Sequence, residues 1–180
     1  PLSNLDAKLR RKVRDDIRDL QQRLGLTVLY VTHDQQEALA VSDKVIVMDN
    51  AVIAQQGAPR ELYERPNSRF LADFIGEANL IQGQSDVSGG SPVFRAEGLA
   101  LPLPAAATSI AVRPDRITLR PTPDAPFRIL RRSFVGASNE YTVAAPWGEL
   151  LVIRPTAEPD LETGATVALE IAPGAAIPLP

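Results

Sequence analysis

Several residue types and patterns are scarce in this sequence of 180 residues, and each shortage excludes a class of protein or site. There is no cysteine, which excludes disulfides and thiolate metal sites and fits a reducing cytoplasm. A single histidine, His33, argues against a zinc site built from this chain alone. No apolar run approaches the roughly 20 residues that span a bilayer, and no signal peptide is visible. A net charge of −3 gives no basic footprint for nucleic acid.

The composition of the chain changes near Asn79. All lysines and the histidine precede this position, whereas most prolines follow it, among many short aliphatic runs. The change predicts a domain boundary, with residues 76–79 as the junction and two domains over 1–79 and 80–180. The proline- and alanine-rich end, Ile171 to Pro180, is predicted to be poorly ordered. The first residue is not methionine, so we expect further sequence upstream.

The start of the chain indicates a helix, a strand and a second helix. An apolar residue recurs every three or four positions over 5–24, which predicts one amphipathic helix that ends at Gly25. The β-branched run 27–32 predicts a strand buried on both faces, as in a parallel sheet. Asp34 is predicted to cap the next short helix, and Glu37 to complete a capping-box pattern.

Four further elements are predicted before the junction. Two strands, 43–49 and 52–56, are expected to form a hairpin. A helix begins at Pro59, because the missing N–H of proline costs nothing in the first turn. A last helix over 68–75 carries apolar residues at helical spacing.

Several segments of the first half share features with a known family. These segments are Pro1-Leu2-Ser3-Asn4-Leu5-Asp6, Val31-Thr32-His33-Asp34-Gln35-Gln36-Glu37-Ala38, Ser42-Asp43-Lys44-Val45-Ile46-Val47-Met48, Gly57-Ala58-Pro59-Arg60-Glu61-Leu62-Tyr63 and Phe74-Ile75-Gly76-Glu77-Ala78-Asn79. With them, the first half resembles the ATPase subunit of an ABC importer, in the branch with a carboxy-terminal regulatory extension. The resemblance implies an α/β remnant of a P-loop NTPase domain, followed by an all-β OB-like barrel or sandwich domain.

The resemblance implies roles for three residues. His33 corresponds to the switch histidine, which hydrogen-bonds the γ-phosphate of ATP and the attacking water. Ser3 and Asp6 fall in the D-loop, which contacts a partner subunit and helps to shape its nucleotide site. Read from the residues alone, a lone histidine can instead pack or face solvent, and Asp6 can act as a helix N-cap only. No metal ligand is expected in this chain.

The motifs that hold nucleotide are missing from the printed sequence. It contains no Gly-rich loop ending in Lys-Ser or Lys-Thr. By the resemblance, the P-loop, the glutamine loop, the signature motif and the Walker B carboxylates all precede Pro1. ATP and Mg²⁺ are therefore expected as cofactors of the full-length ATPase, and no ATPase activity is expected from this chain by itself.

The second half consists of short β-runs separated by proline and glycine, which is typical of a small barrel or sandwich. Three segments stand out: Ala111-Val112-Arg113-Pro114-Asp115-Arg116-Ile117, Phe134-Val135-Gly136 and Asn139-Glu140-Tyr141-Thr142-Val143. They resemble the transport-associated OB-type (TOBE) domain of the same branch. Arg113 and the pair 131–132 could bind an anion, although isolated arginines are more often solvated or ion-paired. The low basic and aromatic content argues against nucleic-acid binding.

The resemblance places the protein in a transport complex at the inner face of the cell membrane. The implied partners are a second ATPase subunit, transmembrane permease subunits and, indirectly, an extracytoplasmic solute-binding protein, with no nucleic acid. The cargo stays open among ferric iron, polyamines, sugars, sulfate and other small solutes, with a lean towards iron or polyamines. The alternative is a non-catalytic regulatory or dimerisation module that senses a small ligand. Apolar faces within 5–56 are expected to drive association, so a dimer is predicted.

Overall fold

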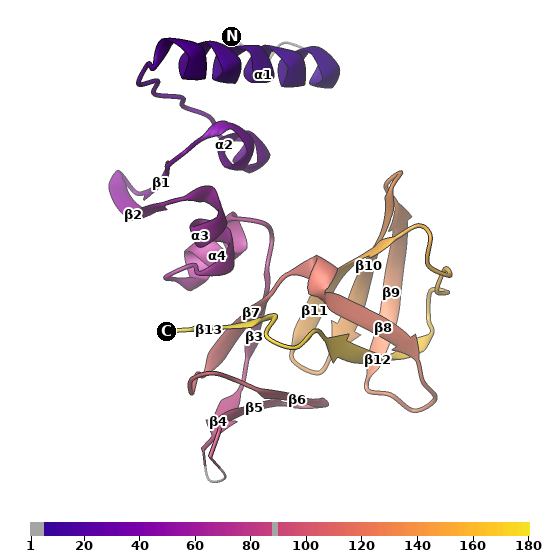
Figure 1. The fold of residues 1–180 in the computed structure, drawn as a ribbon. Helices are drawn as coiled ribbons and strands as arrows, with labels where there is room; N and C mark the ends of the chain where they lie inside the picture. The colour runs from indigo at the N-terminus through magenta and orange to yellow at the C-terminus, as the bar shows by residue number, and fades with distance from the viewer. Residues whose placement is uncertain (1–5, 88–89) are drawn as a thin grey trace. The chain divides into compact units, whose positions relative to one another are not determined.

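The computed structural model describes residues 6–87 and 90–180, and the chain divides into two compact units between Leu62 and Tyr63. Among the described residues, strands make up more of the regular secondary structure than helices do, and the α-helices all lie before Asn79 (Figure 1). None of the helices in this part of the chain is both long enough and apolar enough to cross a bilayer.

The first unit opens with α1 (Ala7–Leu24), which has both of its predicted ends. The Asp6 carboxylate accepts the N–H of Leu9 at 2.8 Å and so caps the first turn. Gly25 ends the helix in the left-handed region at φ +63°, where glycine avoids the strain of a side chain. The apolar side of the helix is exposed at Leu9, Ile17, Leu20 and Leu24.

Residues 27–32 do not form the predicted strand. Leu29 and Val31 each keep 86% of their surface exposed. A strand needs a neighbour to receive its backbone hydrogen bonds, and no strand among the described residues pairs with this segment. The prediction was wrong because a β-branched composition favours extended backbone but supplies no partner.

A short helix and a hairpin follow in the first unit, as predicted. The helix is α2 (Gln35–Val41), and the hairpin pairs β1 (Val45–Asp49) with β2 (Val52–Gly57) in antiparallel fashion. Both residues of the connecting turn, 50–51, have positive φ, as a tight two-residue hairpin turn requires.

Two further helices lie near the division between the units. α3 (Pro59–Glu64) begins at the predicted proline. α4 (Arg69–Phe74) begins after Ser68, whose hydroxyl accepts the N–H of Leu71 at 3.3 Å. Both helices were predicted from the sequence, and the local capping chemistry explains where they start.

The described part of the second unit contains three antiparallel sheets. Their strands are β3 (Asn79–Gln82), β4 (Gln84–Asp86), β5 (Val93–Ala96), β6 (Leu99–Pro102), β7 (Ser109–Val112), β8 (Ile117–Pro121), β9 (Phe127–Phe134), β10 (Ser138–Ala145), β11 (Gly148–Pro155), β12 (Thr166–Ile171) and β13 (Ala176–Leu179). The sheet orders are β11-β10-β9-β12-β8, β13-β7-β3 and β4-β5-β6. Strands from all three sheets contribute to one hydrophobic core, in which Phe94 and Tyr141 are the largest fully buried side chains.

The end of the chain is ordered, in contrast to the prediction for Ile171 to Pro180. β13 pairs with β7, and Pro178 lies opposite Ile110. Proline is tolerated in a strand at a sheet edge, and β13 is an edge strand. The neighbouring Leu179 is buried and anchors the strand in an apolar cluster. The proline-rich composition therefore marks an edge strand here.

Arg113, directly after β7, ties the helical segment of the second unit to its strands. Its guanidinium donates to the carbonyl of Ala72 at 2.8 Å, to that of Tyr63 at 2.5 Å and to that of Ile75. It also lies 4.1 Å from the centre of the Tyr63 ring. Contacts in the structure thus place α4 in the second unit, whereas the boundary proposed near Asn79 followed composition.

Asn79 joins two sheets of the second unit. Its side-chain amide donates to the carbonyl of Leu151 and accepts the N–H of the same residue, both at 2.8 Å. Asn79 begins β3 and Leu151 lies in β11, so one side chain links the three-stranded sheet of β3 with the five-stranded sheet. Asn79 is itself buried, which makes this pairing necessary for its polar atoms.

Candidate functional site

The predicted switch residue, His33, lies in the bend that precedes α2. Its side chain is exposed. The next residue, Asp34, has extended backbone, and its carboxylate accepts the N–H of Glu37 at 3.0 Å. Asp34 is therefore the N-cap of α2, as predicted, and the helix starts immediately after the turn.

Three hydrogen bonds form a closed network around this turn. Thr32 Oγ1 donates to Glu37 Oε2, and the Asp34 N–H donates to Thr32 Oγ1, each at 3.0 Å. The cap from Glu37 N–H to Asp34 closes the circle at 3.0 Å. We call these residues the Thr32–Asp34–Glu37 network. It fixes the chain on both sides of His33 and leaves the imidazole in solvent.

Glu37 is the buried member of the network, with 6% of its surface exposed. Its Oε2 also accepts the Tyr30 hydroxyl at 3.0 Å. Its Oε1 faces two arginines of α1, with Arg10 Nε at 3.9 Å and Arg14 Nη1 at 3.7 Å. A buried carboxylate is unfavourable unless it is hydrogen-bonded and paired, and these groups provide both. Burial, together with the hydrogen bond to Glu37, raises the pKa of Tyr30.

The capping-box prediction for Glu37 is correct for one of its two bonds. In a capping box the Glu37 carboxylate would accept the N–H of Asp34. That N–H donates to Thr32 Oγ1 instead, and the carboxylate is turned towards Tyr30 and the arginines of α1. Contacts with Tyr30 and with the two arginines, which lie earlier in the chain, outweigh the local pattern. Sequence spacing alone therefore missed Thr32 and Glu37 as part of the site.

Of the two predicted D-loop residues, Ser3 and Asp6, the structure describes only Asp6. Ser3 lies outside the described residues. Asp6 is exposed and caps α1, so its N-cap interpretation is confirmed, whereas its role towards a partner stays a prediction. Within the described chain, no hydrogen bond or ion pair joins Asp6 directly to His33. The indirect connection runs along α1 to Arg10 and Arg14, and from them to Glu37.

The site offers few groups to a nucleotide or a metal. The exposed imidazole of His33 can donate to or accept from a phosphate or a water. Among residues 6–87 and 90–180, no three histidine, aspartate or glutamate side chains are grouped so as to hold a metal ion. The printed sequence also has no glycine-rich phosphate loop. The residues present fit one contact to a bound nucleotide and do not form a complete binding site.

The arginines considered as anion ligands are engaged elsewhere. Arg113 is buried against backbone carbonyls, so it is neither solvated nor open to an anion, and burial lowers its pKa. Arg131 donates to the Thr142 hydroxyl at 3.2 Å. Arg132 forms an ion pair with Asp160 at 2.7 Å. We therefore assign no anion site to them.

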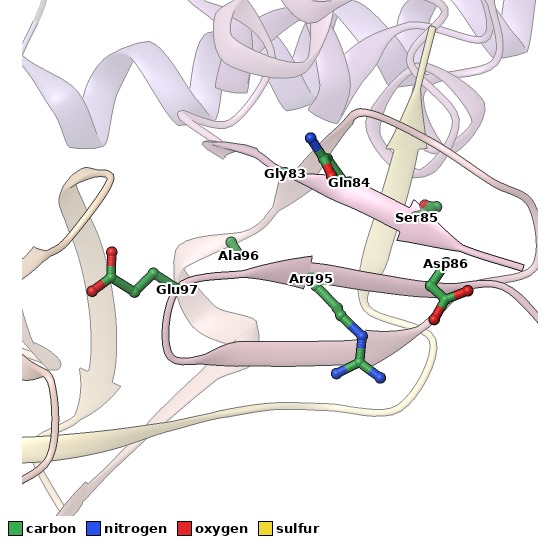
Figure 2. Close-up of a pocket in the computed structure, with 7 residues that line it drawn as sticks. All are labelled: Gly83, Gln84, Ser85, Asp86, Arg95, Ala96 and Glu97. Atoms are coloured by element: carbon green, nitrogen blue, oxygen red, sulfur yellow. The ribbon is translucent and has the colours of Figure 1, made fainter. Parts of the chain in front are cut away.

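A shallow hollow of about 340 Å³ lies along β4 and β5 in the second unit (Figure 2). The residues that line it are Gly83, Gln84, Ser85, Asp86, Arg95, Ala96 and Glu97. In Figure 2 the Glu97 side chain points away from Arg95 and Asp86. The charged side chains that line the hollow do not converge on one point, so we assign no binding or catalytic role to it.

Comparison with known proteins defines the class of the second unit. The TOBE domain family model matches residues 110–179. This range includes β8 to β12, which form the five-stranded sheet, together with β13. The predicted resemblance of the second half to this domain is confirmed.

Comparison with full-length proteins covers the first unit as well. The chain is 49% identical to the "Fe(3+) ions import ATP-binding protein FbpC 1" of Rhizobium meliloti strain 1021 and 44% identical to FbpC of Brucella melitensis biotype 1, over 94% of this chain and 50% of each relative. It is 49% identical to FbpC of Agrobacterium fabrum strain C58, over 85% of this chain and 46% of that protein. Over most of its length the chain is therefore similar to these ATP-binding import proteins, and its residues 110–179 match the TOBE domain. It spans about half the length of the curated relatives it matches.

Proposed function

We propose that this chain is part of the ATP-hydrolysing, energy-coupling subunit of an ABC import system for a small solute. Residues 1–79 supply the end of the α/β P-loop NTPase domain, and residues 80–180 supply the TOBE-type regulatory β domain. The similarity of 94% of the chain to ATP-binding import proteins supports this proposal. The observation that carries it is the exposed His33, held at the start of α2 by a closed hydrogen-bonded network.

In this proposal His33 is the residue of the chain that contacts nucleotide. Its imidazole hydrogen-bonds the γ-phosphate and orients the attacking water, because phosphoryl transfer depends mainly on positioning and charge stabilisation. ATP with Mg²⁺ supplies the phosphoryl group and the metal that neutralises its charge. The groups that hold the nucleotide and the metal belong to the part of the relatives that this chain does not span, so the chain by itself is inactive.

The partners follow from the same proposal. Ser3 and Asp6 contact a second copy of the ATPase subunit near its nucleotide site, in a homodimer. The dimer binds transmembrane permease subunits at the cytoplasmic face of the membrane, and an extracytoplasmic binding protein delivers the solute. We propose ferric iron as the cargo, because the similar proteins are described as Fe(3+) import proteins.

The test is made in the complete subunit, which joins this chain to the remaining part of the ATPase domain. His33→Ala should abolish the release of phosphate from ATP while the affinity for ATP changes little, because only the positioning of the γ-phosphate and water is lost. Leu130→Ala, a variant of an exposed residue in the second unit and away from the site, serves as the control. Full turnover in His33→Ala would refute the assignment. Phosphate release by a contaminant-free preparation of this chain alone would refute the proposal that the chain by itself is inactive.

The structure of the second unit favours an alternative, in which the chain is a non-catalytic module for regulation or dimerisation. Residues 63–180 have their own closed core and include the TOBE match, so they can act as a separate unit. Light scattering of residues 63–180 and of the whole chain tests this alternative. A dimer of residues 63–180 would support the module, whereas a monomer at high concentration would count against it.

A further inference from the structure

The carboxylate of Glu37 is the buried centre of the network that holds the His33 turn. It is almost fully buried, beside a turn whose histidine is exposed. It accepts hydrogen bonds from the hydroxyls of Tyr30 and Thr32 on one oxygen and faces two arginines on the other. Such a concentration of donors around one carboxylate implies a defined orientation for each of them.

The Glu37 carboxylate sets the direction of the hydrogen bonds around His33. An ionised carboxylate can only accept, so the single proton of the Thr32 hydroxyl must point at Glu37. The lone pairs of the same hydroxyl are then free to accept the N–H of Asp34, at 3.0 Å. Glu37 therefore acts on the residue after His33 through the hydroxyl of the residue before it.

The arginines relate this arrangement to α1. Arg10 and Arg14 are four residues apart, so they lie on the same face of the helix one turn from each other. Both face the same oxygen of Glu37. The position of the His33 turn is thus set relative to the helix that Asp6 caps.

We propose that Glu37 is a positioning residue for His33, and that it acts through the Thr32 hydroxyl. The proposal rests on the proposed function, in which His33 contacts the nucleotide. Because Glu37 is almost fully buried, it acts through Thr32 and does not contact the nucleotide itself. It sets the Thr32–Asp34–Glu37 network, which directs the imidazole towards its target and limits the freedom of the backbone on both sides.

The main experiment measures ATP turnover in the complete subunit for Thr32→Val, Thr32→Ser and Glu37→Gln. Thr32→Val keeps the shape of the side chain and removes its hydroxyl, so kcat should fall about tenfold or more with a smaller change in KM for ATP. Thr32→Ser restores the hydroxyl and should restore most of kcat. Glu37→Gln can donate as well as accept, so it should lower kcat in the same way as Thr32→Val.

Asp43→Asn is the matched control for a lost ion pair. Asp43 is exposed and pairs with Arg18 of the same helix α1, at 2.5 Å, away from the network. This variant should keep kcat within about twofold, because exposed pairs contribute little. If Asp43→Asn lowers kcat as much as Glu37→Gln, the effect of Glu37 is a general effect on α1 and the proposal is wrong.

A second readout uses this chain alone and does not depend on activity. Amide hydrogen exchange followed by NMR should be faster for the Asp34 N–H in Thr32→Val than in the natural chain, and Thr32→Ser should be unaffected. Unchanged exchange at Asp34 in Thr32→Val would overturn the proposal. Turnover retained in Thr32→Val and Glu37→Gln, with His33→Ala inactive, would overturn it while the proposed function stands. Turnover retained in His33→Ala would instead refute the proposed function.

Discussion

The two units of the chain differ in how much of their large apolar side chains they bury. In the first unit, large apolar residues are exposed at Leu9, Leu20, Leu24, Val28, Leu29, Val31, Ile46, Met48, Val52 and Ile53. Among the described residues, the largest fully buried side chains other than Leu62 all lie in the second unit. Caps, a glycine stop and a tight turn are enough to define helices and a hairpin locally. A core requires strands that close on one another, and in this chain the second unit has them.

The largest effect that this comparison predicts is on a core side chain. Phe94→Ala should lower the free energy of unfolding by about 3–5 kcal/mol, because a fully buried ring is replaced by a cavity. Leu29→Ala in the first unit should change it by less than about 0.5 kcal/mol, because this side chain is already in water. Urea unfolding followed by circular dichroism, which reports on the backbone of both units, measures both effects. Equal effects of the two variants would remove the distinction between the units.

A smaller effect is predicted for two glycines with positive φ, one in each unit. Gly25→Ala should cost about 1 kcal/mol, from backbone strain alone, because no atom lies within 4 Å of the new methyl group. Gly76→Ala adds a clash, since its Cβ would lie 2.6 Å from the Tyr63 ring and 3.2 Å from Arg113. We expect a total cost of about 2–4 kcal/mol for Gly76→Ala. Thermal unfolding followed by circular dichroism gives the order, and a larger loss for Gly25→Ala would contradict it.

The smallest effect concerns the exposed pair between Arg18 and Asp43. The hydrogen bond from Arg18 lowers the pKa of Asp43 below its ordinary value. A lowered pKa gives stability that is present above about pH 4, the usual range of an aspartate, and is lost as the pH falls through the lowered value. Asp43→Asn should remove this small acid-sensitive contribution. Helix content measured by circular dichroism as the pH is lowered tests it, and identical acid profiles for the two proteins would show that the pair contributes nothing.

Local signals predicted much of the fold. The Asp34 cap, the Gly25 stop, the hairpin turn at 50–51 and the proline start of α3 all depend on residues close in sequence. The predictions failed where distant residues decide the outcome. Residues 27–32 lack a strand partner, and β13 is ordered by its pairing with β7. A local sequence pattern does not show whether a segment will find a strand to pair with. It therefore predicted neither the lack of a partner for residues 27–32 nor the pairing of β13 with β7.

The candidate site shows the same limit. The sequence motif around His33 identified the turn. The exposure of the His33 side chain agrees with a residue that contacts a ligand. The spacing of Asp34 and Glu37 predicted a cap but assigned the Glu37 carboxylate to the wrong partner. Its partners on α1 lie more than twenty residues earlier, and no local rule relates them. Arg113 is a similar case, because its carbonyl partners are 38 to 50 residues away.

The amide of Asn79 has a mechanical consequence. A side-chain amide offers one acceptor and donors in nearly the same geometry as a peptide group, so Asn79 serves as an extra rung between two ladders that are otherwise separate. Sliding β3 past β11 would break both bonds of this rung together. A force applied to the residues just before Asn79 would therefore reach β11 through these two hydrogen bonds.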